Sequence, residues 1–179
     1  MSRLRMSGIL VSMCAVALGA APGRSQPVTA GAPQPGPEYL VKAAYLLNFT
    51  KFVDWPGEAF GESRSGFVLC LVGGDPFGPA IDRMMAGETV NGRAIVVRRM
   101  EMADSSCHLA FFAGPGGRAE AAGRYLLTVG EGAGFLREGG AIAMVLENRR
   151  VRFDVSRKAA AAAGLKVSSR LLSVARNVE

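Results

Sequence analysis

The hydrophobic pattern of the chain is dominated by Phe67–Val72, a run of six apolar residues without a polar interruption. A run that is apolar at every position is typical of a strand that is covered on both faces. Gly73 and Gly74 then predict a turn, Pro76 suits the start of a helix, and the apolar-periodic segment Phe77–Met85 predicts that helix. These features predict half of a β-α-β unit in a sheet with helices on each side.

Residues 38–53 predict another helix, because they contain good helix formers and neither glycine nor proline. The apolar residues that nearly encircle this helix are Leu40, Val41, Ala44, Leu47, Phe49 and Phe52. A helix of this kind is buried on more than one side, so it can pack on the sheet and also against a partner chain. It ends before Pro56, since proline disfavours helical backbone in the residue that precedes it.

The rest of the chain alternates between apolar runs and turns. The predicted strands are 94–100, 108–113, 125–129, 141–147 and 150–155, and the predicted helical segments are 118–123, a turn around Phe135, 159–163 and 168–177. Asn148 and Arg149 predict a hairpin between the last two strands, and Ser168 is placed to cap the last helix. This order predicts a single α/β domain, residues 38–179, with a mixed β-sheet flanked by helices.

The residues before this domain differ from it in composition. Residues 1–25 resemble a cleaved signal peptide, because Arg3 and Arg5 precede the uncharged apolar run 8–21. That run is short for a membrane span of about 20 residues, and an uncleaved N-terminal anchor is the alternative. Residues 26–37 are rich in proline, glycine and alanine, which predicts a disordered linker.

The net charge of the chain is +6, from 21 basic and 15 acidic residues. Three of the arginines precede residue 38, where no acidic residue occurs, so the domain itself carries 18 basic against 15 acidic residues, or +3. This excess is too small and too dispersed along the sequence to indicate binding to nucleic acid.

Export to an oxidising compartment changes how the cysteines are interpreted. Cys70 and Cys107 remain after cleavage, and each lies in or beside an apolar run that predicts a strand. Two cysteines in an exported domain are expected to form one disulfide, and two buried free thiols are the alternative. A metal site is disfavoured, because His108 is the only histidine in the sequence.

No motif in the sequence requires an enzyme. The loop 73–78 resembles a dinucleotide-binding loop, but Asp75 stands where the second glycine is needed, and neither a P-loop nor a Gly-x-Ser-x-Gly elbow occurs. Cys107 and His108 are neighbours on a predicted strand, so their side chains point to opposite faces. Candidate paired carboxylates are Asp75, Asp82 and Glu88, which no pattern singles out. We predict a non-enzymatic protein without a cofactor or a metal ion.

Seven short motifs follow one another along residues 38–179. They lie at Lys42–Pro56, Val72–Gly78, Cys107–His108, Leu127–Gly130, Phe135–Ile142, Val151–Val155 and Gly164–Leu172. In this order they resemble the YfiR-like family of bacterial periplasmic proteins. Each motif is weak by itself, but the combination is specific and covers nearly the whole predicted domain.

The resemblance implies an α/β domain that forms a homodimer, with a disulfide between the strand positions of Cys70 and Cys107. In the best-known members the protein inhibits a membrane-bound diguanylate cyclase, the enzyme that makes cyclic di-GMP, by binding its periplasmic sensor domain. We therefore predict a periplasmic regulatory protein that inhibits a membrane signalling protein, either a diguanylate cyclase or a sensor kinase. The alternative is a small-molecule-binding protein or enzyme that uses the glycine-rich loops at the sheet edge.

An inhibitor of this kind needs an exposed apolar anchor, because such side chains dominate the energetics of interfaces. One candidate is Trp55 with Pro56, at the exit of the first helix. The other is the approach to the last helix, Val167 to Leu171, next to Phe153 on the final predicted strand. The alternative for Trp55 and Leu171 is that they simply belong to the core.

We expect signal peptidase to cut between Ala20 and Gln26, where small residues follow one another. The product would be a periplasmic protein that osmotic shock releases. N-terminal sequencing of the released protein measures the cleavage site. An intact Met1 in the membrane fraction would instead support the uncleaved anchor.

Overall fold

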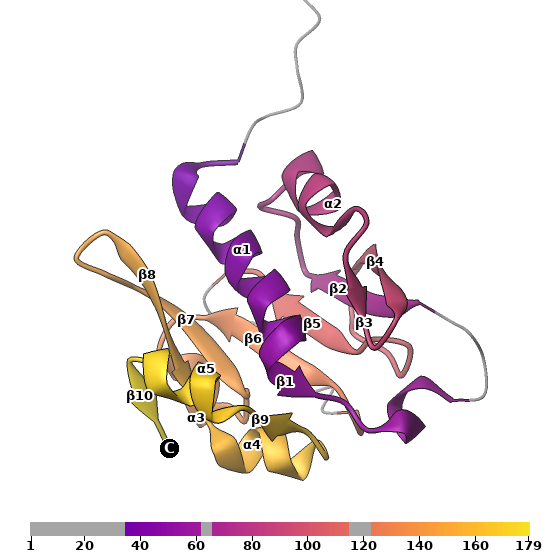
Figure 1. Cartoon of the computed structure of the whole chain (residues 1–179). Coiled ribbons are helices and arrows are strands. Elements are labelled where there is room, and N and C mark those ends of the chain that lie inside the picture. Colours follow the sequence, from indigo (N-terminus) through magenta and orange to yellow (C-terminus); the bar gives the residue numbers. More distant parts are fainter. Residues whose placement is uncertain (1–34, 62–65, 115–122) are drawn as a thin grey trace, which may run out of the picture. The chain divides into compact units, whose positions relative to one another are not determined.

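The computed structural model describes residues 35–61, 66–114 and 123–179 (Figure 1). The helices in these ranges are α1 (Pro37–Phe52), α2 (Pro79–Met85), α3 (Gly134–Arg137), α4 (Arg157–Ala162) and α5 (Ser169–Val174), and Gly57–Phe60 forms a 3-10 helix, η1. The strands are β1 (Val53–Asp54), β2 (Phe67–Val72), β3 (Thr89–Val90), β4 (Arg93–Met100), β5 (Leu109–Phe112), β6 (Leu127–Glu131), β7 (Ile142–Glu147), β8 (Arg150–Val155), β9 (Lys166–Val167) and β10 (Asn177–Val178). The predicted fold, a single α/β domain with a mixed sheet, is confirmed.

Eight strands form one sheet in the order β10-β8-β7-β6-β5-β2-β4-β3. The central strands from β7 to β4 run parallel to one another, whereas β8 pairs antiparallel with β7 and β3 pairs antiparallel with β4. The chain passes from β2 to β4 on one side and then returns to β5 on the other side of β2. Strands β1 and β9 form a separate antiparallel pair.

The predicted coverage of β2 on both faces is confirmed, because every residue of this strand is buried. Successive side chains of a strand point to opposite faces. The residues at 67, 69 and 71 belong to the main core, which also contains side chains from α1, α2, α4 and α5. The residues at 68, 70 and 72 belong to a smaller core, where Phe135 of α3 packs.

Helix α1 lies across the face of the sheet that carries the main core (Figure 1). It begins at Pro37, one residue before the predicted start, and proline fits the first turn because its missing N–H has no partner there. Leu46 and Phe49 are fully buried, whereas Leu40 and Val41 on the opposite side are 43% and 46% exposed. The helix is therefore apolar on both sides but buried on one side within the described chain.

Cys70 and Cys107 form a disulfide within the smaller core, as predicted. Cys70 lies in β2 and Cys107 shortly precedes the neighbouring strand β5, with their Cα atoms 5.9 Å apart. Among the described helices, α3 is the one that adds a side chain to this core, and it is a single turn long. The disulfide therefore joins two strands on the face of the sheet with the thinner cover.

The hairpin predicted around Asn148 and Arg149 is also confirmed, with Glu147 opposite Arg150. Both turn residues have positive φ, 49° and 60°, which matches the turn that joins two twisted strands through two residues. Strands β1, β3, β9 and β10 were not predicted, because two residues are too few to show a periodicity. The predicted helix 118–123 lies outside the described residues except for residue 123.

Trp55 closes one end of the main core, where it is 4% exposed. Its indole N–H donates to the carbonyl oxygens of His108 and Tyr125, with N–O distances of 3.2 and 3.0 Å. Its ring meets Phe67 edge to face, with the ring centroids 4.9 Å apart. The side chain thus fills apolar space and also donates to two carbonyl groups beside β5 and β6, of which that of His108 also accepts the N–H of Leu127.

His108 is a buried titratable residue next to Trp55. Its Nδ1 accepts the N–H of Val68 at 3.0 Å, and its ring stacks on Phe60 and Phe67 with centroids 5.0 and 5.1 Å apart. Burial lowers the pKa of His108, and the charge of Arg93 lowers it further, against an opposing hydrogen bond with the backbone of Ala59. The ring is therefore neutral at neutral pH, as an acceptor of the Val68 N–H must be.

The lowered pKa of His108 predicts a loss of stability in acid. The unfolded chain has the ordinary histidine pKa of about 6.5, so the contribution is complete above that pH and is lost as the pH falls through the folded pKa. The variant His108→Asn can still accept the Val68 N–H but does not titrate. Between about pH 7 and pH 5, its free energy of unfolding in urea should fall less than that of the wild type. Equal slopes would assign the acid sensitivity to other groups.

The disulfide is expected to stabilise the domain by about 4 kcal/mol, the chain-entropy value for a sequence separation of 37 residues. Urea denaturation of Cys70→Ala/Cys107→Ala should show this loss, and added reductant should not change the variant. Alkylation of the unreduced wild type in urea, where a buried free thiol would also be exposed, should label neither Cys70 nor Cys107 when analysed by mass spectrometry. Labelling of both thiols would contradict the disulfide.

Candidate interaction surface

The five residues predicted to bind a partner differ in their exposure. Trp55, Phe153 and Leu171 are 4%, 1% and 3% exposed and belong to the main core. Pro56 and Val167 are partly exposed. Trp55, Phe153 and Leu171 therefore lie beneath the surface of the described chain, whereas Pro56 and Val167 reach it. Contact of any of these five residues with a partner stays a prediction.

A short ribbon holds Val167 at the surface. Val167 lies in β9 and is paired with Val53 of β1. The N–H of the next residue, Ser168, donates to the carbonyl oxygen of Phe52 at 2.9 Å. The Ser168 hydroxyl accepts the N–H of Leu171 at 3.2 Å and so caps α5, as predicted. Backbone hydrogen bonds on both sides therefore fix the position of Val167.

A groove of about 420 Å³ lies between α1 and α5. Its lining residues are Tyr45, Asn48, Phe52, Phe153, Arg170, Leu171, Ser173 and Val174. The floor is Phe153, whose ring meets Tyr45 and Phe49 edge to face with centroids 5.3 and 5.2 Å apart. Val174 on the rim is 59% exposed, so apolar surface rises from the core to the solvent here.

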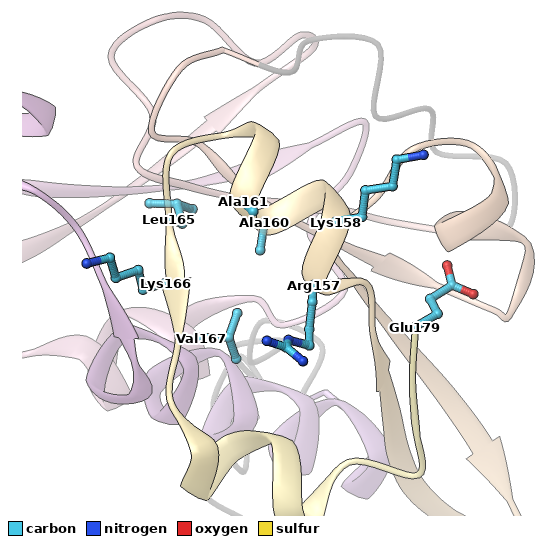
Figure 2. A pocket seen from close by; sticks show the side chains of 8 residues that line it. All are labelled: Arg157, Lys158, Ala160, Ala161, Leu165, Lys166, Val167 and Glu179. Carbon is cyan, nitrogen blue, oxygen red and sulfur yellow. The ribbon is translucent and has the colours of Figure 1, made fainter.

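A second hollow, of about 670 Å³, lies beside α4, β9 and the end of the chain (Figure 2). We call it the basic pocket, and its lining residues are Arg157, Lys158, Ala160, Ala161, Leu165, Lys166, Val167 and Glu179. Ala160 and Leu165 are 1% and 3% exposed and give it an apolar floor. Figure 2 shows the side chain of Arg157 extending toward Val167, while Lys158 and Lys166 point to opposite sides. The groove and the basic pocket together are called the last-helix surface below.

The last-helix surface is rich in positive charge. Between residues 155 and 178 the sequence contains no acidic residue and five cationic ones, namely Arg157, Lys158, Lys166, Arg170 and Arg176. Arg176 pairs with Asp154 and Glu147, whereas the other four form no ion pair with any described residue. This cluster was not predicted, although the absence of acidic residues over this stretch is visible in the sequence.

The three carboxylates considered as candidates for a catalytic pair each form an ion pair within the described chain. The guanidinium of Arg99 binds Asp75 at 2.7 Å and Asp82 at 2.6 Å, and Glu88 pairs with Lys51 at 3.0 Å. The hydrogen bond from Arg99 holds the pKa of Asp82 below its ordinary value, so this carboxyl stays ionised. These contacts connect β4 with α2 and its loop, and α1 with the turn after α2.

In the glycine-rich loop 73–78, backbone N–H groups bind the carboxylate of Asp75. The Oδ1 atom of Asp75 accepts the N–H groups of Phe77 and Gly78 at 2.8 and 2.9 Å. Amides of this kind, between a strand and a helix, are the groups that a bound phosphate would use. Helix α2 begins at Pro79, beyond the start predicted near Pro76, because the loop first closes around this aspartate.

Lys42 is a buried cation near the carboxyl ends of the parallel strands, with 5% of its surface exposed. Its ammonium group binds Glu38 on the preceding turn of α1 and Glu131 at the end of β6. Burial lowers the pKa of Lys42, but the hydrogen bonds to Glu131 and Glu38 outweigh it, so the pKa is raised. Glu131 also accepts the N–H of Gly114 at 2.6 Å. The cluster fastens α1 to the ends of β5 and β6.

The described residues contain no further group that points to a missing ligand. Within them, no three or more His, Cys, Asp or Glu residues gather where they could hold a metal ion. Every buried side-chain nitrogen or oxygen atom in these ranges has a hydrogen-bond partner. None of the helices described is long and apolar enough to cross a membrane.

Comparison with known proteins identifies the family. A solved structure of a conserved domain protein from Vibrio cholerae O1 biovar El Tor has a TM-score of 0.40 and 10% sequence identity, covering 63% of this chain. The match spans 54% of that protein, or about half its length. A search of curated proteins found no match. The model of the YfiR/HmsC-like family matches residues 39–176. The chain therefore belongs to the YfiR/HmsC-like family of periplasmic regulatory proteins.

Proposed function

We propose that this protein inhibits a membrane-bound signalling protein by binding the sensor domain that the partner exposes in the periplasm. The output of that partner is a diguanylate cyclase or a sensor kinase. Membership of the YfiR/HmsC-like family supports the regulatory role. Inhibition by binding needs a preformed surface and no reacting group, and the last-helix surface is of that kind.

The observation that carries the proposal is the position of Val167. This partly exposed apolar side chain lines the basic pocket and directly precedes α5, whose residues line the groove. The backbone hydrogen bond from Ser168 to Phe52 and the pairing with β1 hold it in place. A surface that is already ordered loses little conformational entropy when a partner binds.

The proposed location of the mature protein is the periplasm, after the signal peptide has been cleaved. The buried disulfide between Cys70 and Cys107 supports this location, since such bonds persist in oxidising compartments. The proposed partner exposes its sensor domain in the same compartment.

We also propose that two copies of the chain form a homodimer through the outer side of α1. Leu40 and Val41 are among the exposed large apolar residues, and Leu47 beside them is partly exposed. Within the described chain this side of the helix is only partly covered, since Val41 lines a hollow with Leu146 and Val151 of the β7–β8 hairpin. A second copy would remove it from water, as expected of a helix that is apolar all round.

The test of the proposed function is Val167→Glu, which places a carboxylate at the centre of the last-helix surface. We expect loss of co-purification with a membrane sensor protein encoded beside this gene. The melting temperature should fall by several degrees with the protein still folded, because Val167 is partly exposed but also packs against the main core.

Met102→Glu is the matched control, because Met102 is 79% exposed in the connection between β4 and β5. This variant should bind the partner as the wild type does. Unfolding of Val167→Glu, or unchanged binding by it, would show that the interface lies elsewhere.

A further inference from the structure

We propose that the part of the partner that docks on the last-helix surface is an acidic segment with an apolar side chain between its carboxylates. This inference rests on the proposed function and specifies the chemistry of the partner. It follows from the charge, the shape and the apolar floor of the basic pocket, taken together.

The positive charge around the basic pocket favours an acidic partner. Arg157, Lys158 and Lys166 line one hollow, and none of them forms an ion pair with a described residue. Arg170 on the neighbouring groove adds a fourth such cation. The acid among the lining residues of the basic pocket is Glu179. Unpaired cations gathered on one surface favour a negatively charged partner and raise its rate of association.

The shape and the apolar floor of the basic pocket favour an apolar side chain in the partner. The basic pocket measures about 670 Å³, and buried Ala160 and Leu165 lie at its base. Val167 lies at the side of the basic pocket, where the side chain of Arg157 approaches it (Figure 2). A small aliphatic side chain fits such a floor. A carboxylate beside it can reach Arg157, and carboxylates farther out on either side can reach Lys158 and Lys166, whose side chains extend away from the hollow. Such an anchor inside a polar rim is the usual anatomy of a protein interface.

A second copy of this chain does not fit the same surface. In a two-fold contact the same surface faces itself, so four cations would meet four cations, with Glu179 as the acid that the lining of each copy supplies. Like charges that face each other across an interface oppose association. The homodimer proposed above uses the outer side of α1, which borders the groove, and leaves the basic pocket available.

An acidic peptide tests this inference directly. The probe is a short fluorescein-labelled peptide in which aspartates flank a single leucine, and the matched probe has asparagines instead. Fluorescence anisotropy with the full mature protein should show tighter binding of the aspartate peptide. The difference should shrink as salt rises from about 50 to 300 mM, because salt screens exposed charges.

Variants of the protein locate the binding. Arg157→Gln/Lys158→Gln/Lys166→Gln should weaken binding of the aspartate peptide by about tenfold, since each exposed ion pair contributes a small factor. Arg83→Gln removes an exposed cation on α2 and should leave binding unchanged. Equal binding of both peptides, binding of neither, or no effect of the triple variant would overturn the inference.

Two further measurements separate the possible outcomes. Vesicles that contain phosphatidylglycerol should not bind the protein, and vesicle binding that the triple variant abolishes would assign the cations to a lipid surface. If Val167→Glu abolishes co-purification while the two peptides bind equally, the proposed function stands and the acidic chemistry is wrong. If Val167→Glu leaves co-purification intact, the proposed function itself fails at this surface.

Discussion

The fold depends on the burial of β2 from both sides. A six-residue strand without a polar side chain needs apolar cover on each face, and the protein supplies it unequally. Four helices add side chains to the main core, whereas the smaller core has the single turn of α3 and a disulfide. The hydrophobic effect thus orders one face, while on the other a covalent bond supplements a small apolar area. The last-helix surface lies on α1, α4, α5, β8 and β9, elements that contribute side chains to the main core.

The sequence predicted the elements whose residues repeat a pattern. The apolar run of β2, the encircled helix α1, the two-residue turn at Asn148 and the cap at Ser168 all depend on neighbours within a few positions. The four two-residue strands do not depend on such neighbours. Strands β1 and β9, for example, form because distant segments of the chain meet through backbone hydrogen bonds. Such pairing depends on the tertiary structure and leaves no local trace in the sequence.

The candidate site was less predictable, because an apolar residue fits a core and an interface equally well. Trp55, Phe153 and Leu171 satisfy the chemistry of an anchor but are used inside the described chain. The cations were predictable in principle, since no acidic residue lies between 155 and 178. Their gathering around a hollow was not, because it requires α4 to face β9 across a turn at Gly164. Charge is visible in a sequence, but its arrangement in space depends on the fold.

The burial of the disulfide has a kinetic consequence. Cys70 is 0% exposed and Cys107 is 5% exposed, so a thiolate in solution has no direct line of attack on either sulfur. Thiol–disulfide exchange requires such an approach. Reduction must therefore wait until this part of the sheet opens, and its rate should saturate at the opening rate as the concentration of reductant rises. The lifetime of the bond in a reducing medium thus measures local opening between β2 and β5 rather than the strength of the reductant.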